Sequence, residues 1–504
     1  MSIETILLLA IALPFLTAIA VLVSGASPNL RDGISIAAGC IVFYLVSQIY
    51  DVVSAVDEVT FTLLEMIPGL TISFVVEPLG MVFALIASFL WIITTIYAIG
   101  YMRGHHEENQ TRFFACFAIA IGCALGVAFA GNMLTLFVFY EALTISTFPL
   151  VTHSGTNEAK KSGRIYLGIL LGTSIGLQLI AIIWTWSLAG TLDFTDGGIV
   201  RGYVEAPMVG ILLALYVFGI GKAAVMPFHR WLPAAMVAPT PVSALLHAVA
   251  VVKAGVFTVL KVTVYIFGID FLQDTAGWEW LQYVAAATIL FASFIAMTKD
   301  NLKARLAYST ISQLSYIVLA AMLATTTSIV GGGMHIVMHA FGKITLFFCA
   351  GAFMVASHKT EISQMRGIGR VMPFTTGAFL IGSLSIIGLP PFGGLWSKWY
   401  IALGALEADQ IIMVGVLMVS SLLSIAYLLP IPFRGFFADP KDNPPLANDH
   451  VHDPDHDHNH DHDSIEGIKE APWPCLLAIA ITSIGCVVLF FYPEPLVDLL
   501  WSIF

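Results

Sequence analysis

The sequence predicts an all-α membrane protein that crosses the bilayer about fourteen times. Of its 504 residues, 58% are hydrophobic and 11% are charged, whereas an ordinary soluble domain has roughly 25% charged residues. The mean hydropathy is +0.88, which is more apolar surface than a globular core can hide. The apolar residues fall in runs of about twenty, the length that a helix needs to cross a hydrocarbon layer of ~30 Å. These three observations exclude a soluble globular fold.

Fourteen apolar runs are candidate spans. They lie at residues 3–24, 31–50, 74–101, 113–130, 132–152, 164–189, 206–237, 241–266, 280–298, 302–323, 329–357, 373–407, 410–434 and 471–492. The first run follows no basic segment of the kind that opens a signal peptide, so we expect it to remain in the mature protein.

The basic residues test this number of spans, because cytoplasmic loops carry an excess of Lys and Arg. One set of alternate loops holds sixteen basic residues, and the opposite set holds only Arg201. The sixteen are Arg31, Arg103, Arg112, Lys160, Lys161, Arg164, Arg230, Lys299, Lys303, Arg305, Lys359, Arg366, Arg370, Arg434, Lys441 and Lys469. We therefore expect both termini to face away from the cytoplasm.

Much of the net charge of −11 lies in one loop, which contains the tract DHVHDPDHDHNHDHD. Its histidines are weak candidates for metal ligands: His450, His452, His456, His458, His460 and His462. The composition is that of a disordered segment and the spacing fits no preformed site, so we expect a solvated and non-essential loop. The six cysteines stand singly, and the chain has no GxGxxG or P-loop pattern, so no cofactor is expected.

Five lysines fall inside the predicted spans: Lys222, Lys253, Lys261, Lys343 and Lys398. A lysine at mid-helix costs ~2.5–3.5 kcal/mol on insertion scales, so packing alone would not retain five of them. Lys261 lies near the end of its span, where snorkelling to the interface and a functional position are equally good explanations. We expect the other four to face the bundle interior or a wet cavity.

Glu141, in LTLFVFYEALTISTFPLV, is the single acidic residue that we expect at mid-span. A lone carboxylate in hydrocarbon would take up a proton, whereas a carboxylate beside an ammonium can stay charged. We therefore expect Glu141 to form an ion pair with a buried lysine. Burial disfavours the charged form of an amine, so the remaining lysines are suited to load and release protons.

Two spans are interrupted by proline beside a buried lysine. The first, GIGKAAVMPFHRWLP, holds Lys222, and the second, IIGLPPFGGLWSKWY, holds Lys398. Unpaired backbone at membrane depth is tolerated where it lines a cavity. Broken helices in corresponding positions of two halves point to an ion path between inverted repeats. The alternative is two unrelated proline kinks.

The breaks lie five spans apart, which predicts two five-helix repeats related by inversion. The expected units are N-terminal helices at 1–112, a first repeat at 113–266, a second repeat at 280–434, a cytoplasmic loop at 435–470 and a C-terminal helix at 471–504.

His335, His339 and Lys343 stand at positions i, i+4 and i+8 of GGGMHIVMHAFGKITLFF, so they form one helical stripe with neighbours about 6 Å apart. Such a stripe of ionisable groups in a membrane helix indicates a proton relay. Histidines satisfied within the core and a zinc site are the alternatives. Zinc is disfavoured because no third ligand is near in the sequence.

His247 and Lys253 are six residues apart in APTPVSALLHAVAVVKAGVF, which places them on different faces of a regular helix. One can face the first broken helix while the other faces the second half of the bundle. This arrangement would suit a lateral relay between the halves.

These motifs resemble a known family. The segments FVFYEALTISTFPLV, GKAAVMPFHRWLPAAMVAPTPVSALLHA, TKDNLKARLAYSTISQLSYI, MHIVMHAFGKITLFF and GLPPFGGLWSKW are similar to those of the antiporter-like subunits of respiratory complex I, membrane-bound hydrogenases and Mrp-type cation/proton antiporters. The resemblance runs over about residues 75–410. The lysines at the second break and in VVKAGVF most resemble the D-subunit branch of the Mrp family, and complex I middle subunits are the alternative.

The resemblance implies a role for each matching residue. Glu141 and Lys222 would form the ion pair, and His247 and Lys253 the connecting relay. The stripe of His335, His339 and Lys343 would be the central axis, and Lys398 would be the terminal lysine toward the outer side.

Two functions are therefore expected. The first is a proton-translocating subunit that works with other membrane subunits to exchange protons for Na⁺ or another monovalent cation. The second is the proton-pumping arm of an NADH-quinone oxidoreductase or hydrogenase, in which partner chains carry the redox chemistry. A stand-alone transporter would need a substrate pocket in this chain, and nucleic acid is not an expected partner. We expect the protein in a prokaryotic-type cell membrane.

Overall fold

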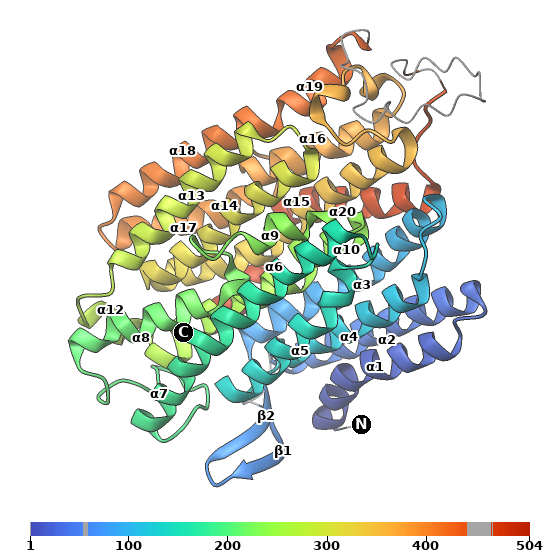
Figure 1. The fold of residues 1–504 in the computed structure, drawn as a ribbon. Coiled ribbons are helices and arrows are strands. Elements are labelled where there is room, and N and C mark those ends of the chain that lie inside the picture. The colour runs from blue at the N-terminus through green and yellow to red at the C-terminus, as the bar shows by residue number, and fades with distance from the viewer. Residues whose placement is uncertain (1, 54–58, 441–464, 466) are drawn as a thin grey trace.

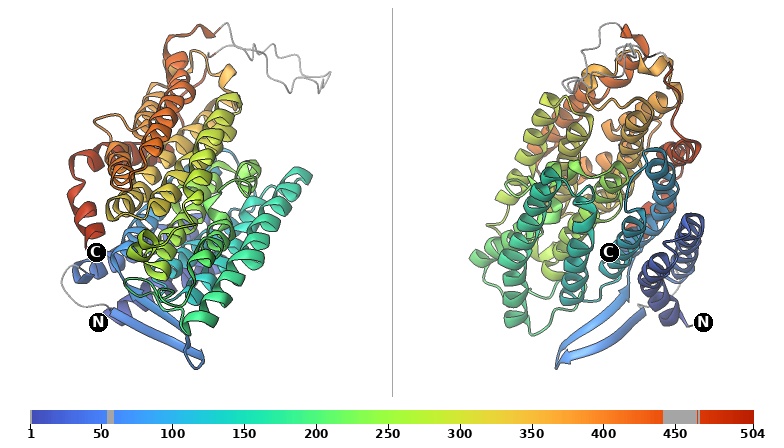
Figure 2. Two further views of the ribbon diagram at one scale, coloured as in Figure 1. Left: turned by 90° about the vertical axis from the view of Figure 1, so that its left-hand side faces the viewer. Right: turned by 45° about the vertical axis from the view of Figure 1, so that its right-hand side comes forward.

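The computed structural model describes residues 2–53, 59–440, 465 and 467–504. Among these residues, 11 helices are long and apolar enough to cross a membrane. Two shorter apolar helices end where a broken helix is interrupted. The helices run side by side in one elongated bundle (Figures 1 and 2). The predicted all-α polytopic fold is confirmed.

The elements follow the predicted spans closely. The first third contains α1 (Ile3–Val23), α2 (Pro28–Val53), β1 (Val59–Ile67), β2 (Leu70–Val76), α3 (Pro78–Gly104), α4 (Gln110–Ala128) and α5 (Met133–Val151). The middle contains α6 (Asn157–Thr173), the π-helix η1 (Ser174–Gln178), α7 (Leu179–Ala189), α8 (Ala206–Gly219), the 3₁₀ turn η2 (Gly221–Ala223), α9 (Trp231–Ala234), the 3₁₀ turn η3 (Ala235–Val237), α10 (Thr240–Ala244), the π-helix η4 (Leu245–Val249), α11 (Val251–Lys261), the π-helix η5 (Val262–Phe267) and α12 (Ile269–Asp274).

The remainder contains α13 (Trp280–Thr298), α14 (Leu302–Leu323), α15 (Thr326–Ser357), the 3₁₀ turns η6 (Ile362–Gln364) and η7 (Ile368–Arg370), α16 (Pro373–Ile387), α17 (Gly394–Glu407), α18 (Ile411–Leu428), α19 (Pro430–Phe437), α20 (Trp473–Phe491) and α21 (Glu494–Trp501).

The hairpin of β1 and β2 was not predicted from the sequence. It is antiparallel and projects from one end of the bundle, which we call the hairpin end (Figure 1). Gly69 makes its turn with φ +81°, a conformation that glycine adopts without steric cost. The span expected at 74–101 therefore begins only at Pro78, because the preceding residues belong to a strand.

The first break differs from the expected single span at 206–237. α8 ends at Gly219, and the chain continues through η2 and short turns. Neighbouring side chains satisfy the backbone groups that the break frees: Trp231 Nε1 donates to the Gly221 carbonyl at 2.9 Å, and the Lys222 amide donates to the Tyr140 hydroxyl at 3.1 Å. Non-helical backbone at membrane depth is stable only when it is satisfied in this way.

The second break separates α16 from α17. Gly388 closes α16 with φ +87°, the left-handed conformation of a common helix C-cap. Lys398, one turn into α17, donates from Nζ to the Ile387 carbonyl at 3.0 Å. An ammonium is favourable there because the carbonyl end of a helix carries partial negative charge.

Helix α15 is the centre of the fold, and every residue from Thr327 to Phe353 is buried. It packs against α14, α16, α17, α20 and α3 (Figure 1). The α17 backbone approaches so closely that a Cβ on Gly331 would lie 2.7 Å from the Ile401 nitrogen. Small residues allow such close approach between membrane helices. The ionisable stripe of α15 therefore lies inside protein and not against lipid.

Candidate functional site: a chain of buried amines and imidazoles

Lys222 lies in η2, within the first break, and is fully buried. Its Nζ donates to the Tyr140 carbonyl at 2.7 Å and to Thr144 Oγ1 at 2.6 Å, both on α5. The ammonium also lies 3.1 Å from the centroid of the Tyr140 ring, which adds a cation–π contact. The contacts that hold this buried amine are therefore dipolar ones.

The expected direct ion pair between Glu141 and Lys222 is not formed between these two described residues. Lys222 bonds instead to groups on either side of Glu141 along α5. Both carboxylate oxygens of Glu141 are buried and have no hydrogen-bond partner among the residues that the structure describes. The acid and the amine thus share one region without contact, which corrects the prediction of a closed pair.

Lys253, on α11, connects the first break to the central helix. A Cβ on Gly255 would lie 2.4 Å from the Lys222 carbonyl carbon, so α11 passes directly against the first break. Lys253 is fully buried, and its Nζ lies 2.7 Å from His339 Nδ1. This contact joins the two halves of the chain at the centre of the bundle.

The histidines of α15 form the stripe that their spacing predicts. The His335 and His339 rings lie 5.8 Å apart. His335 Nδ1 then lies 2.8 Å from Ser397 Oγ on α17. A path of ionisable and hydroxyl groups therefore runs from Lys253 through both imidazoles to the residue beside Lys398.

Lys398 is only partly buried, unlike Lys222 and Lys253. It bonds to the Ile387 carbonyl and, at 3.2 Å, to Ser421 Oγ. The Tyr316 ring stacks on His335 with centroids 5.5 Å apart and also lies 4.9 Å from Lys398 Nζ. Tyr316 thereby spans the last step between imidazole and amine.

Lys343 continues the stripe but has different partners. Its Nζ donates to Ser309 Oγ at 2.6 Å, and Ser309 contacts the Tyr427 hydroxyl at 2.9 Å. Tyr427 in turn lies 3.0 Å from Ser424 Oγ. Lys343 therefore leads into a hydroxyl cluster between α14 and α18, a side arm of the stripe.

Lys261 does not snorkel. It is fully buried, and its Nζ lies 2.6 Å from Glu77 Oε1, so it forms an ion pair with a carboxylate that is 5% exposed. This result also corrects the expectation that Glu141 is the single buried acid of the spans. Glu77 fell inside a predicted span, at 74–101, and its charge there was the signal that sequence reasoning missed.

His247 lies in η4, and its side chain is outside the described part of the structure. The histidines of the acidic loop, at 450–462, also lie outside the described residues. Among the residues that are described, no group of three or more His, Cys, Asp or Glu side chains could hold a metal ion.

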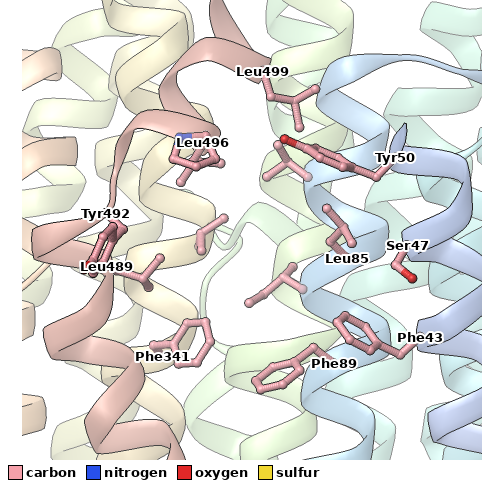
Figure 3. A pocket seen from close by; sticks show the side chains of 14 residues that line it. Phe43, Ser47, Tyr50, Leu85, Phe89, Phe341, Leu489, Tyr492, Leu496 and Leu499 are labelled. Atoms are coloured by element: carbon pink, nitrogen blue, oxygen red, sulfur yellow. The ribbon is translucent and has the colours of Figure 1, made fainter. Parts of the chain in front are cut away.

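Two further features lie away from this chain. A cavity of about 580 Å³ between α2, α3, α15, α20 and α21 has an apolar lining that includes Phe43, Leu85, Phe89, Phe341, Leu489 and Leu499 (Figure 3). None of the buried lysines or histidines described above lines it. Its lining holds the hydroxyls of Ser47, Tyr50 and Tyr492 but no charged side chain.

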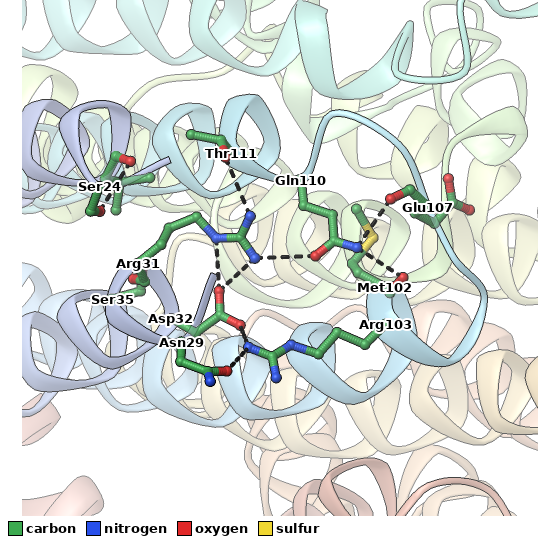
Figure 4. A network of polar contacts seen from close by, with 11 residues as sticks. Ser24, Asn29, Arg31, Asp32, Ser35, Met102, Arg103, Glu107, Gln110 and Thr111 are labelled. Atoms are coloured by element: carbon green, nitrogen blue, oxygen red, sulfur yellow. Dashed lines mark hydrogen bonds and ion pairs between the residues drawn. The ribbon is translucent and has the colours of Figure 1, made fainter. Parts of the chain in front are cut away.

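The second feature is a polar network at the end opposite the hairpin (Figure 4). Arg31 pairs with Asp32 at 2.7 Å, and Arg103 pairs with the other Asp32 oxygen at 2.5 Å. Arg31 also reaches Gln110 at 3.1 Å and Thr111 at 3.3 Å. These contacts tie α2 to α3 and α4, which is a structural role.

Sequence reasoning also missed the uncharged members of the chain. They are Tyr140, Thr144, Ser309, Tyr316 and Ser397. Three of them had a usable signal, because Tyr140 and Thr144 flank Glu141 and Ser397 precedes Lys398. Ser309 and Tyr316 become visible only when α14 is packed against α15.

The fold and this buried chain define a class, that of polytopic membrane proteins with a chain of buried ionisable groups between their helices. The family model described as NADH:quinone oxidoreductase/Mrp antiporter, TM matches residues 130–424, and the model for the N-terminus of NADH-ubiquinone oxidoreductase (complex I) chain 5 matches residues 57–114. The first match covers more than half of the chain. The protein therefore belongs to the NADH:quinone oxidoreductase/Mrp antiporter membrane family.

Quinone oxidoreductase subunits and a cation/proton antiporter subunit are both among the proteins that are similar to this chain. NADH-quinone oxidoreductase subunit N of Desulforudis audaxviator is 32% identical over 71% of this chain and 72% of its own length. NAD(P)H-quinone oxidoreductase chain 5 of Synechocystis sp. is 31% identical over 68% of this chain, and this chain spans 51% of that protein. A probable K⁺/H⁺ antiporter protein of Rhizobium meliloti is 31% identical over 76% of this chain and 38% of its own length.

Two solved structures share the fold. A chain of the Mrp complex from a Dietzia species superimposes with a TM-score of 0.84 at 22% identity, covering 100% of this chain and 97% of that one. A chain of the archaeal membrane-bound sulfane sulfur reductase gives a TM-score of 0.83 at 22% identity, covering 98% and 96%. Both chains come from complexes, and what this chain shares with them is the fold.

Proposed function

We propose that this protein is the proton-translocating membrane component of a multisubunit antiporter that exchanges protons for a monovalent cation, with Na⁺ as that cation. The observation that carries the proposal is the path from Lys253 through His339 and His335 to Ser397 and Lys398. Ionisable residues inside a membrane protein are expensive, and pathways for ions and protons are where they are retained. The chain needs no cofactor for this task.

The proposed mechanism is electrostatic. A proton that loads Lys222 places a positive charge beside α11 and raises the energy of a second charge on Lys253, because charges interact strongly where water is excluded. Lys253 then passes its proton to His339, and the imidazoles carry it toward Lys398. Lys253 can take up its next proton when Lys222 releases its own.

In this proposal, Glu141 controls when Lys222 keeps its charge and when transfer onward is favoured. A carboxylate near Lys222 without a direct contact is suited to two states, one in which the ion pair closes and one in which Lys222 bonds to Tyr140 and Thr144. Closing the pair stabilises the charged amine, and opening it favours transfer onward. Such a two-state element is what couples one ion site to another.

We also propose an orientation and an internal symmetry. The excess of basic residues on alternate loops favours an orientation with the hairpin end and both termini outside the cytoplasm. The two breaks would be the equivalent centres of inverted repeats at 113–266 and 280–434. In support, each break brings a lysine against a backbone carbonyl, Lys222 at the first and Lys398 at the second.

The second candidate is the proton-pumping arm of a complex I-like quinone oxidoreductase. It is favoured by relatives at similar identity that carry that name. The same residues would act, and electron transfer in partner chains would drive them.

The deciding experiment is gentle purification of the native complex with identification of its companions by mass spectrometry, followed by reconstitution into vesicles. We expect only small membrane subunits, and we expect Na⁺ addition to dissipate an imposed pH gradient. Iron–sulfur or flavin subunits in the complex, or a pH gradient that responds to a quinone substrate and not to monovalent cations, would support the second candidate instead.

A further inference from the structure

The ion pair of Glu77 and Lys261 stands apart from the path described above. Besides the 2.6 Å contact with Glu77, Lys261 Nζ donates to the Ala130 carbonyl at 2.9 Å and lies 4.0 Å from the centroid of the Phe194 ring. Replacing a buried ion pair by apolar residues of similar volume is often neutral or stabilising. Stability alone is therefore a weak reason for this pair to be present.

Its position relates it to the path. Lys253 and Lys261 are eight residues apart on α11, so they share one broad face and are ~12 Å apart along the helix. Phe257 lies between them on that face. Its ring centroid is 5.7 Å from Lys261 Nζ and 5.1 Å from the Phe83 ring. The helix thus carries an amine, an aromatic ring and a second amine in line.

Polar groups continue from the pair toward the hairpin end. Ala130, which binds Lys261, forms a β-bridge with Phe74 of β2. Two residues further, the side-chain amide of Asn132 donates from Nδ2 to the Thr71 carbonyl at 2.8 Å and to Ser73 Oγ at 2.9 Å. The Glu77–Lys261 pair therefore lies next to a row of hydrogen-bonded polar groups that runs along the hairpin.

We infer that Glu77 and Lys261 form a further proton-transfer site, a branch that connects Lys253 with the hairpin end and in which Phe257 is the gate. This inference rests on the proposed function. In the transfer, the Lys261 ammonium gives its proton to the Glu77 carboxylate, leaving a neutral amine and a carboxylic acid. Glu77 then releases the proton to water at the hairpin end. When the Phe257 ring turns aside, water enters between the two amines, and the Lys261 amine takes the next proton from Lys253 through that water.

The test uses the intact complex in vesicles and measures proton flux. Lys261→Arg keeps the charge and the ion pair, but a guanidinium does not release its proton. The double variant Glu77→Gln/Lys261→Met removes both charges and leaves neither one unpaired. We expect both variants to assemble and both to lower the flux several-fold.

The control is another buried ion pair with no link to the path. The double variant Asp32→Asn/Arg31→Met neutralises the pair at the opposite end. Arg103, the other partner of Asp32, has a side chain that is 43% exposed and stays hydrated, so we expect the flux of the unmodified complex. That same flux in Lys261→Arg would show that the pair is structural and would overturn the branch. If that variant fails to assemble, unchanged flux in Glu77→Gln/Lys261→Met has the same meaning.

A third measurement separates the branch from the function on which it rests. Lys253→Met is expected to abolish flux if the protein translocates protons at all along this path. An inactive Lys253→Met with fully active Lys261 variants would remove only the branch. Normal flux in Lys253→Met would remove the proposed function itself.

Discussion

The two helix breaks each hold a lysine, but they hold it differently. At the first break, Lys222 is fully buried and bonds to a carbonyl and a hydroxyl of the neighbouring helix α5. At the second break, Lys398 is partly exposed and bonds to the carbonyl end of α16, the preceding half of its own broken helix. A closed site with an acid nearby suits loading under control, whereas an amine nearer to the protein surface suits release.

The largest effect is expected at the closed site. In the proposed mechanism, Lys222→Ala removes the amine that is loaded first, and Glu141→Ala removes the charge that attracts it. Each is expected to reduce cation-driven proton flux to that of vesicles without the complex, while assembly stays intact on native gels. Normal exchange in either variant would contradict the loading mechanism.

A second prediction concerns the size of each lysine pocket. Lys222→Arg must fit a larger head into a fully packed site, and overpacking costs about 1–3 kcal/mol. Lys398→Arg changes a residue that is only partly buried and is expected to cost less. Thermal unfolding of the two purified complexes measures the difference. Equal losses of stability would show that the two lysine side chains are packed equally tightly.

The third prediction concerns the bond between the central stripe and the second break. Ser397→Ala removes the hydroxyl 2.8 Å from His335 Nδ1, which leaves a buried nitrogen unsatisfied at a cost of about 1–3 kcal/mol. We expect slower proton flux together with a lower unfolding temperature. Ser146→Ala is a suitable control, because that hydroxyl bonds within its own helix, to the Leu143 carbonyl. A rate unchanged from that control would remove Ser397 from the path.

A smaller effect is expected at Tyr316. Tyr316→Phe keeps the ring between His335 and Lys398 and loses the hydroxyl, whose bond to the Leu417 carbonyl at 3.2 Å is worth about 1 kcal/mol. Flux should stay near normal, while Tyr316→Ala should reduce it because the ring is lost. If Tyr316→Phe alone stops transport, the hydroxyl and not the ring belongs to the path.

The smallest effect is expected from deleting residues 449–463. The tract has the composition of a solvated loop, so both breaks should work as before. Proton flux with and without added Zn²⁺ is the measurement. A clear loss of flux, or a metal effect that disappears with the deletion, would give the loop a role that its composition does not predict.

The sequence determined a great deal here because membrane burial imposes a cost that is visible residue by residue. A run of about twenty apolar residues identifies a span, and a lysine within it is conspicuous. The positions of Lys222, Lys253, Lys343 and Lys398 followed from that rule alone, as did the stripe of α15 from its spacing. Even the breaks were visible, since proline cannot donate the hydrogen bond that a continuous helix needs.

Tertiary structure decided what these residues touch. Partner choice depends on how helices far apart in sequence pack, so the Glu77–Lys261 pair, the Lys253–His339 contact and the separation of Glu141 from Lys222 could not be read from local pattern. The hairpin escaped notice for a related reason, because its strands of nine and seven residues are shorter than a span and the apolar end of β2 continues into the run of α3. Hydropathy thus determined which residues lie in the membrane-spanning segments, and only packing determined which buried charges meet.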